Sequence, residues 1–207
     1  MKAYKFLRPG AVGPFSRVPW PTPEGDAPGA WVEAIGGIAA CRTAVHACRI
    51  EHLPWWIQEE LWEVELAEPV RLSGHKLLAP RGRLVRRVEG WDSAGAKAFA
   101  CACAREAADR ATLAMDAAGA AEGAAALRGA ADLHVLHAVV GRLRPPEPAR
   151  VAVQMAADAA VRAIAGHPAT TAYIAAHAAH HADGPAAMAA ERRRQSSWLA
   201  ETLGLAV

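Results

Sequence analysis

An abrupt change of composition near residue 92 constrains the fold of this chain more than any other feature. Six of the seven tryptophans and nine of the fourteen prolines lie in residues 1–92, whereas residues 93–207 are rich in alanine and carry only Trp198. Aromatic residues favour strands, proline favours turns and alanine favours helix. We therefore predict an α+β protein: a small irregular antiparallel β domain over residues 1–92, followed by an alanine-rich bundle of about five helices over residues 93–207.

Short runs in residues 1–92 have the apolar and polar patterns of strands, and turn signals such as Pro9-Gly10 and Glu68-Pro69 separate them. We predict strands over residues 3–7, 61–66, 75–78 and 82–88, with one short helix over residues 51–60. In the second half, Gly, Pro and Asp divide the alanine tracts into separate helices. These helices are predicted over residues 93–116, 124–143, 149–165, 169–182 and 186–203.

Charge and hydropathy exclude several functional classes. The chain has 207 residues with 23 basic and 21 acidic side chains, and the small excess is shared evenly between the halves. This balance gives no reason to expect a nucleic-acid partner. Charged residues and glycine interrupt every apolar run before it reaches about 18 residues, so no membrane partner is expected. We expect a soluble, cytoplasmic protein, and the oligomeric state stays open.

Two arginine runs and four cysteines are expected to be structural. Strict alternation over residues 81–87 splits their arginines between strand faces, and residues 192–194 fan around a helix. These arginines are expected to be solvated or to pair with Glu59, Glu60 and Glu89. The cysteines lack the spacing of a zinc site and are expected to be small buried apolar groups: Cys41, Cys48, Cys101 and Cys103.

The opening and closing segments resemble a bacterial family. The segments AYKFL, GPFS, CRTAVHACRIEHLPWWIQEELWEVEL and HKLLAPRGRLVRRVEGWD are similar to the opening of uncharacterised actinobacterial proteins, and AAMAAERRRQSSWLAETLGL is similar to their tail. Phage proteins of unknown function share a related pattern of a Gly/Val-(Phe/His)-x-Cys element, a short aromatic helix and an acidic strand. The resemblance covers about two thirds of the chain. It implies the same β domain and helices, and it brings no activity with it.

Residues 41–66 concentrate the side chains that would carry chemistry in the first half. A period of two places Glu63 and Glu65 on one strand face, opposite the apolar residues. With His46 as a third catalytic group, and with Arg42 as a ligand-binding cation, the two carboxylates predict an acid/base or cation-binding site. The alternative is a half-exposed strand whose acidic face meets solvent.

Trp55 and Trp56 are predicted to bind a planar ligand by stacking. Adjacent residues on a helix point about 100° apart, so at most one of the two rings faces the core squarely. The alternative is that both rings pack in the core or between the two halves of the chain.

Histidine pairs in the second half predict a metal site. The pairs are three and four residues apart, which places the members of each pair on one helix face. Such a pair is a known way to chelate a divalent metal. If the two helices pack antiparallel, the pairs converge on zinc, iron, manganese or nickel, and the alternative is that they lie on solvent faces. The predicted metal ligands are His134, His137, His177 and His181.

Two functions from different classes remain open. The first is a small-molecule-acting enzyme or ligand-binding protein of bacterial metabolism, with its site where the β domain and the helical bundle meet. The second is a protein-interaction or regulatory module, of the phage-defence or toxin–antitoxin type, without catalysis. A divalent transition metal is the one cofactor that the sequence suggests, and it is compatible with either function.

Overall fold

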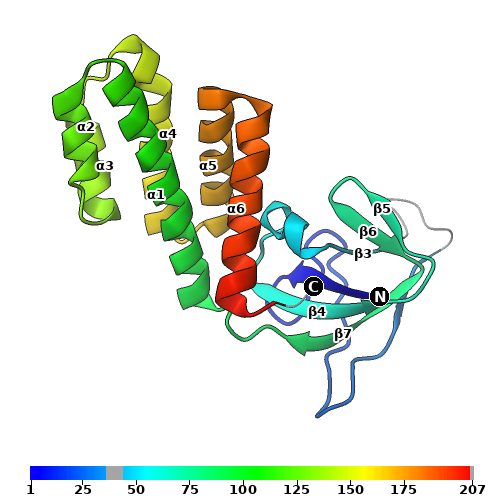
Figure 1. Ribbon diagram of the computed structural model, residues 1–207. Helices are drawn as coiled ribbons and strands as arrows, with labels where there is room; N and C mark the ends of the chain where they lie inside the picture. The colour runs from blue at the N-terminus through cyan, green and yellow to red at the C-terminus, as the bar shows by residue number, and fades with distance from the viewer. Residues whose placement is uncertain (36–43, 206–207) are drawn as a thin grey trace. The chain divides into compact units, whose positions relative to one another are not determined.

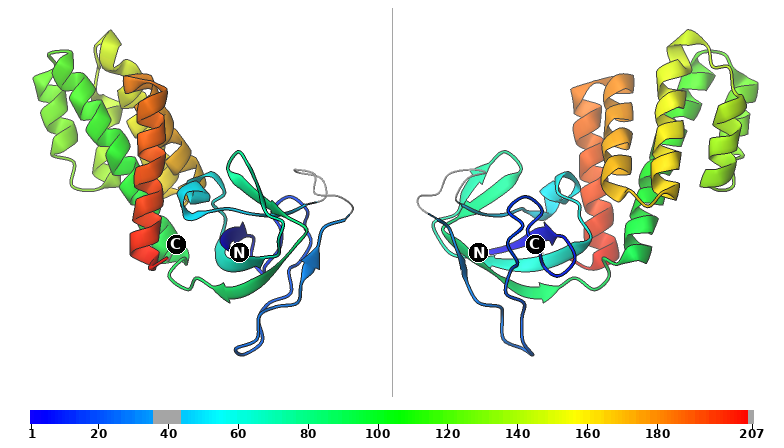
Figure 2. Two further views of the ribbon diagram at one scale, coloured as in Figure 1. Left: turned by 45° about the vertical axis from the view of Figure 1, so that its right-hand side comes forward. Right: turned by 180° about the vertical axis from the view of Figure 1, so that it is seen from behind.

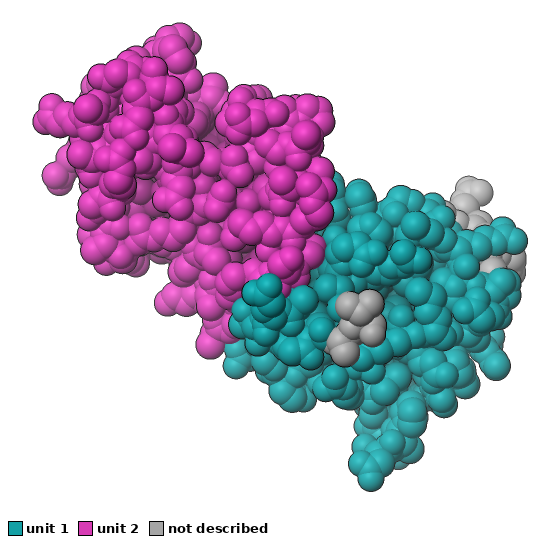
Figure 3. Space-filling model, viewed as in Figure 1, with its two compact units in different colours: residues 1–93, 199–207 teal, residues 94–198 magenta. Residues whose placement is uncertain are grey.

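The computed structural model describes residues 1–35 and 44–205, and the chain forms two compact units. Unit 1 comprises residues 1–93 and 199–207, and unit 2 comprises residues 94–198 (Figure 3). Unit 1 holds the antiparallel strands, and unit 2 is helical (Figure 1). The predicted α+β class is confirmed, while the domain boundary at residue 92 stays a prediction.

Unit 1 is built from two antiparallel sheets. The four-stranded sheet has the order β1-β4-β7-β2, and the three-stranded sheet has the order β3-β6-β5. The strands are β1 (Lys2–Leu7), β2 (Val32–Glu33), β3 (Val45–Ala47), β4 (Glu60–Leu66), β5 (Arg71–Ser73), β6 (Lys76–Ala79) and β7 (Arg81–Arg87). The four predicted strands correspond to β1, β4, β6 and β7. The short helix predicted over residues 51–60 is a 3-10 helix, η1, over Ile50–Trp55.

Alternate residues from both sheets share one core. Trp62, Val64 and Leu66 of β4 are buried there, together with residues of β1, β3, β6 and β7. Because successive side chains of a strand point to opposite faces, the intervening Glu63 and Glu65 face away from this core. The apolar face predicted for β4 is therefore confirmed.

A β-bulge changes which arginines of β7 share a face. Glu65 pairs with Arg83 and Glu63 with Arg86, and the register shifts between Glu63 and Val64. One extra residue of β7 therefore lies between the two pairs, and strict alternation fails at this point. Strict alternation places Arg86 on the face opposite to Arg83, so that prediction is wrong for Arg86. Both arginines lie beside carboxylates of β4.

The helices of the second half are α1 (Ser93–Ala117), α2 (Ala121–Arg128), α3 (Leu133–Arg142), α4 (Glu147–Ile164), α5 (Pro168–Asp183) and α6 (Pro185–Leu203). The single helix predicted over residues 124–143 is wrong, because α2 ends before Gly129 and α3 starts separately. Asp132 is the N-cap of α3, and its side chain accepts a hydrogen bond from the backbone N–H of Val135 at 2.8 Å. A carboxylate in this position satisfies a backbone donor that the first helical turn leaves open.

Small side chains allow the helices of unit 2 to approach closely. Helix α4 contacts both α3 and α5 and lies between them (Figures 1 and 2). Its alanines at positions 156, 159 and 160 are fully buried, as are those at 172, 175 and 176 of α5. Each alanine buries little apolar area, so larger residues must supply much of the hydrophobic stabilisation.

Among the described helices, none is long and apolar enough to cross a membrane.

Several polar residues of α6 are buried, against the prediction that its arginine run is solvated. Glu191 is 1% exposed and Arg192 is 5% exposed, whereas Arg193 is exposed. The Arg194 guanidinium donates two hydrogen bonds to the Glu191 carboxylate, at 2.8 and 2.7 Å. Gln195 donates to the carbonyl of Ala172 on α5 at 3.0 Å, which ties α6 to α5. The Glu191 carboxylate can be buried because the partly exposed Arg194 guanidinium compensates its charge.

Candidate functional site

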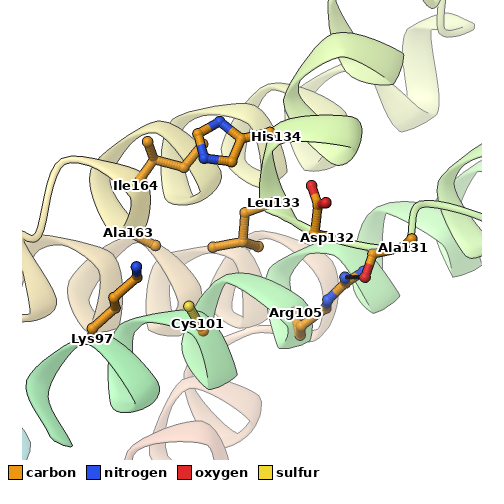
Figure 4. Close-up of a pocket in the computed structure, with 9 residues that line it drawn as sticks. All are labelled: Lys97, Cys101, Arg105, Ala131, Asp132, Leu133, His134, Ala163 and Ile164. Atoms are coloured by element: carbon orange, nitrogen blue, oxygen red, sulfur yellow. Dashed lines mark hydrogen bonds between the residues drawn. The ribbon is translucent and has the colours of Figure 1, made fainter. Parts of the chain in front are cut away.

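An open pocket of about 370 Å³ lies within unit 2, between α1, the start of α3 and the end of α4 (Figure 4). Its volume is within the range of small-molecule sites in proteins. All of its lining residues belong to unit 2. They are Lys97, Cys101, Arg105, Ala131, Asp132, Leu133, His134, Ala163 and Ile164.

Helix α1 supplies one wall of the pocket with three polar side chains. Lys97, Cys101 and Arg105 follow one another at intervals of four residues, so they share one face of the helix. Figure 4 shows Lys97 and Cys101 pointing from α1 toward α3 and α4. The Arg105 guanidinium donates to the carbonyls of Ala130 and Ala131, at 2.6 and 2.7 Å. Arg105 therefore anchors the turn before α3 and keeps its charge beside the pocket.

The start of α3 supplies the facing wall. The hydrogen bond from the Val135 backbone N–H holds the pKa of Asp132 below its usual value, so this carboxylate is ionised at neutral pH. His134 lies beside Ile164 at the other end of the pocket (Figure 4). Leu133, which is buried, forms the apolar surface between them. The pocket thus combines an apolar floor with a few polar groups, as small-molecule sites do.

The cysteines differ sharply in their environments. Cys48 and Cys103 are buried as predicted, and burial raises the pKa of each thiol to about 12. Both are therefore protonated and unreactive at neutral pH. Cys101 is only half-buried and lines the pocket, so the prediction of a buried apolar group is wrong for this residue. Cys41 lies outside the described residues.

The two predicted catalytic glutamates are held in ion pairs. Glu63 forms ion pairs with Lys2 at 3.2 Å and with Arg86 at 3.0 Å. Glu65 pairs with Arg83 at 2.6 Å. Cross-strand pairs of opposite charge stabilise an antiparallel sheet, and this is what the geometry of β4 and β7 supports. Their predicted catalytic role stays a prediction.

His46, the third predicted catalytic residue, lies on the other sheet. It pairs with Leu78 of β6, and its side chain faces away from the shared core, as those of Glu63 and Glu65 do on β4. The structure therefore does not bring His46 together with the two carboxylates. Burial, with smaller contributions from the charges of Lys5 and Lys76, lowers the pKa of His46 to about 4. The imidazole is neutral at pH 7.

The residues predicted to bind a planar ligand are partly engaged. Trp55 stacks on His75 with ring centroids 4.1 Å apart and planes 9° from parallel. The indole N–H of Trp56 donates to the carbonyl of His75 at 2.9 Å, and the Lys76 ammonium lies 4.8 Å from the centre of its ring. These contacts connect the end of η1 to the turn and first residue of β6. Arg42, the third residue predicted to bind a ligand, lies outside the described residues.

The histidines predicted to bind a metal lie on two helices that do not adjoin. His134 and His137 are on α3 and His177 and His181 are on α5, with α4 between these helices. Within residues 1–35 and 44–205, no three or more His, Cys, Asp or Glu side chains group closely enough to hold a metal ion. The four-histidine site stays a prediction.

Sequence reasoning did not select the polar residues of α1 that line the pocket. The signal was present in the spacing of Lys97, Cys101 and Arg105, but most of the residues around them are alanine. An alanine-rich helix has no apolar stripe that identifies its buried face, so the spacing alone could not show where the residues point. Only the break between α2 and α3, which brings Asp132 and His134 opposite α1, defines the pocket.

Comparison with known proteins identifies no relative from which the role of this site could be inferred. No family model, no curated protein and no solved structure matches the chain. The resemblance to actinobacterial and phage proteins stays a prediction. Any functional inference therefore depends on the geometry of the described residues.

Proposed function

We propose that the chain is a small-molecule-binding protein whose site is the pocket between α1, α3 and α4. The observation that carries the proposal is the pocket itself, about 370 Å³ in volume, with an apolar floor and polar groups on facing walls. Neither the ammonium of Lys97 nor the thiol of Cys101 has a hydrogen bond or ion pair among the described residues, so both side chains are available to a ligand. The proposal replaces the predicted site at the meeting of the two halves with one inside the helical unit.

A pocket-filling variant tests the proposal. In Cys101→Phe the larger side chain occupies the pocket, whereas Leu113→Phe adds a ring at a position of the same helix that is 67% exposed. A library of small organic acids, phosphates, amines and neutral metabolites is screened by thermal shift on the full chain. We expect compounds that raise the Tm of the wild type and of Leu113→Phe but not that of Cys101→Phe. The proposal fails if no compound behaves in this way.

A second candidate function, a protein-interaction module, rests on one observation in unit 1. Phe15 is 82% exposed, and Val18, three residues further along the same loop, is 50% exposed. Single exposed apolar residues are common, whereas neighbouring ones can form a patch that marks a contact surface. In a pull-down from a cell lysate, a protein that binds the wild type is expected to be lost with Phe15→Ser and retained with Cys101→Phe. A protein that is retained with Phe15→Ser and lost with Cys101→Phe would exclude this candidate.

A further inference from the structure

The charges around the pocket do not cancel. Of the described residues that line it, Asp132 alone carries a carboxylate, and that carboxylate caps α3. Lys97 and Arg105 each carry a positive charge on the facing wall. Arg105 lies at the same end of the pocket as Asp132, and their charges offset each other (Figure 4). The ammonium of Lys97 is left without a carboxylate partner among the described residues.

Lys97 is also placed to meet a ligand rather than the protein. Its side chain is exposed and points toward Ala163 at the end of α4 (Figure 4). Backbone N–H groups already satisfy the carbonyls of Val161 and Ala163 there, at 3.0 and 3.1 Å. The ammonium makes no hydrogen bond or ion pair among the described residues. An ammonium keeps three donors, all of which a bound oxyanion can accept.

We propose that the pocket binds a small organic anion, with its carboxylate or phosphate group on Lys97 and its apolar part over Leu133, Ala163 and Ile164. This inference rests on the proposed function and names its ligand class. A charged hydrogen bond to Lys97 supplies the affinity for the anionic group. The apolar residues accept the remainder of the molecule, and the Cys101 thiol lies beside it.

The thiol of Cys101 allows the charge of the pocket to be measured without knowing the ligand. Methanethiosulfonate reagents transfer a group RS to a thiolate, forming a mixed disulfide and releasing methanesulfinate. An anionic and a cationic reagent of equal size are compared on the full chain in a Cys41→Ser background. The rate at Cys101 is read by peptide mass spectrometry and divided by the rate at the same residue in the unfolded chain.

One charge at about 7 Å in water changes a local concentration about threefold, so we expect the normalised anionic rate to exceed the cationic rate by roughly five- to tenfold. Salt at 1 M is expected to abolish the difference. Lys97→Glu is expected to reverse it. Arg150→Gln, which removes an exposed cation outside the pocket lining, is expected to leave it unchanged.

Occupancy is tested with inorganic phosphate and, separately, with acetate, each added before a neutral reagent of the same kind. Slower labelling of Cys101 by phosphate, by acetate or by both supports the proposal and identifies the preferred oxyanion, provided that Lys97→Gln removes the protection. The proposal is overturned if neither anion protects, or if the normalised rates do not depend on reagent charge. It is also overturned if Lys97→Gln lowers the Tm without changing charge preference, since Lys97 would then only stabilise the end of α4. Compounds that bind the pocket regardless of charge would contradict this inference and leave the proposed function intact.

Discussion

Lys5 is a partly buried cation of β1, and its desolvation is expected to cost stability. Its ammonium donates to the carbonyl of His46 at 2.6 Å and lies 4.9 Å from the centre of the Trp20 ring. No carboxylate contacts it among the described residues. Burial lowers the pKa of Lys5 to about 8, because a desolvated ammonium is less stable than a neutral amine. The charged form therefore destabilises the fold at neutral pH.

Replacing Lys5 by Met is expected to stabilise the protein at pH 7. Below pH 8 the folded and unfolded chains both carry the proton and the burial cost is complete. Between about pH 8 and 10.5 the unfolded chain binds more protons than the folded one, so wild-type stability rises with pH. The rise is about 3 kcal/mol in unfolding free energy. Urea unfolding from pH 7 to 10.5 should therefore show an advantage of Lys5→Met that shrinks with pH.

Lys5→Arg is the matched control, because a guanidinium stays charged throughout this range. The free energy of unfolding of Lys5→Arg should be lower than that of Lys5→Met by a similar amount at every pH. A Lys5→Met variant that is less stable than the wild type at pH 7, with a difference independent of pH, would show that the hydrogen bond to His46 outweighs the burial cost.

The buried carboxylate of Glu60 stabilises the turn at Gly10 and Ala11. It accepts hydrogen bonds at 3.0 Å from the backbone N–H groups of Gly10 and Ala11 and from the indole N–H of Trp62. Gly10 and Ala11 have positive φ angles of 77° and 58°, and the carboxylate gathers their two adjacent donors. Burial favours the protonated acid, but these donors and the charge of Arg87 outweigh it and lower the pKa of Glu60.

Glu60→Gln is expected to cost about 2 kcal/mol, because the amide NH₂ cannot accept and leaves a buried N–H unsatisfied. A carboxylate with a depressed pKa contributes stability above its unfolded pKa and loses it as the pH falls through the folded value. The difference between wild type and variant should thus be complete at pH 7 and vanish under acid conditions. Denaturant unfolding at several pH values measures it, and exposed Glu59→Gln is the control. Equal effects of the two variants would contradict the assigned role.

The sequence predicted the strands better than it predicted which faces of the helices are buried. β4 was predictable because Trp62, Val64 and Leu66 alternate with glutamates. The bulge in β7 could not be predicted, because none of the residues from Arg83 to Arg86 is typical of a bulge. In α6, Glu191 and Arg192 look like surface residues, since their burial depends on partners from elsewhere in the fold. The pocket was missed for a similar reason, because it depends on the break between α2 and α3 after Arg128, where one helix was predicted.

The buried carboxylate of α6 is expected to be important for the stability of unit 2. Glu191 accepts from Arg194 and from Gln195, whose side-chain N–H lies 2.8 Å away. Arg194 is partly exposed and keeps Glu106 as a second partner at 3.5 Å, so the main cost of removing Glu191 is the loss of a buried acceptor from these donors, typically about 1 to 3 kcal/mol. Glu191→Ala should lower the free energy of unfolding by about 1 to 3 kcal/mol, measured by circular dichroism at 222 nm. Glu201→Ala, at an exposed position of the same helix, should change it by less than about 0.5 kcal/mol. A loss of similar size in both variants would contradict this prediction.

The last residues of the chain belong to unit 1 rather than to the helical unit that precedes them. Residues 199–207 belong with residues 1–93, although α6 runs without a break from unit 2 to Leu203. Within unit 1, a methyl group added at Gly90 would lie 3.2 Å from the Leu203 side chain. Leu199 is fully buried. The last turn of α6 therefore contributes to the stability of a unit whose other residues lie more than 100 positions earlier in the chain.

Leu199→Ala tests this contribution. Loss of a fully buried leucine side chain costs about 2 to 5 kcal/mol, and the affected unit holds six of the seven tryptophans. We expect the unfolding midpoint measured by tryptophan fluorescence to fall clearly in Leu199→Ala. Leu113→Ala, at a position that is 67% exposed, should leave it nearly unchanged. If Leu199→Ala lowers the midpoint of the 222 nm signal and leaves the fluorescence midpoint in place, the last turn of α6 stabilises the helical unit instead, because the tryptophans of residues 1–93 would then unfold as in the wild type.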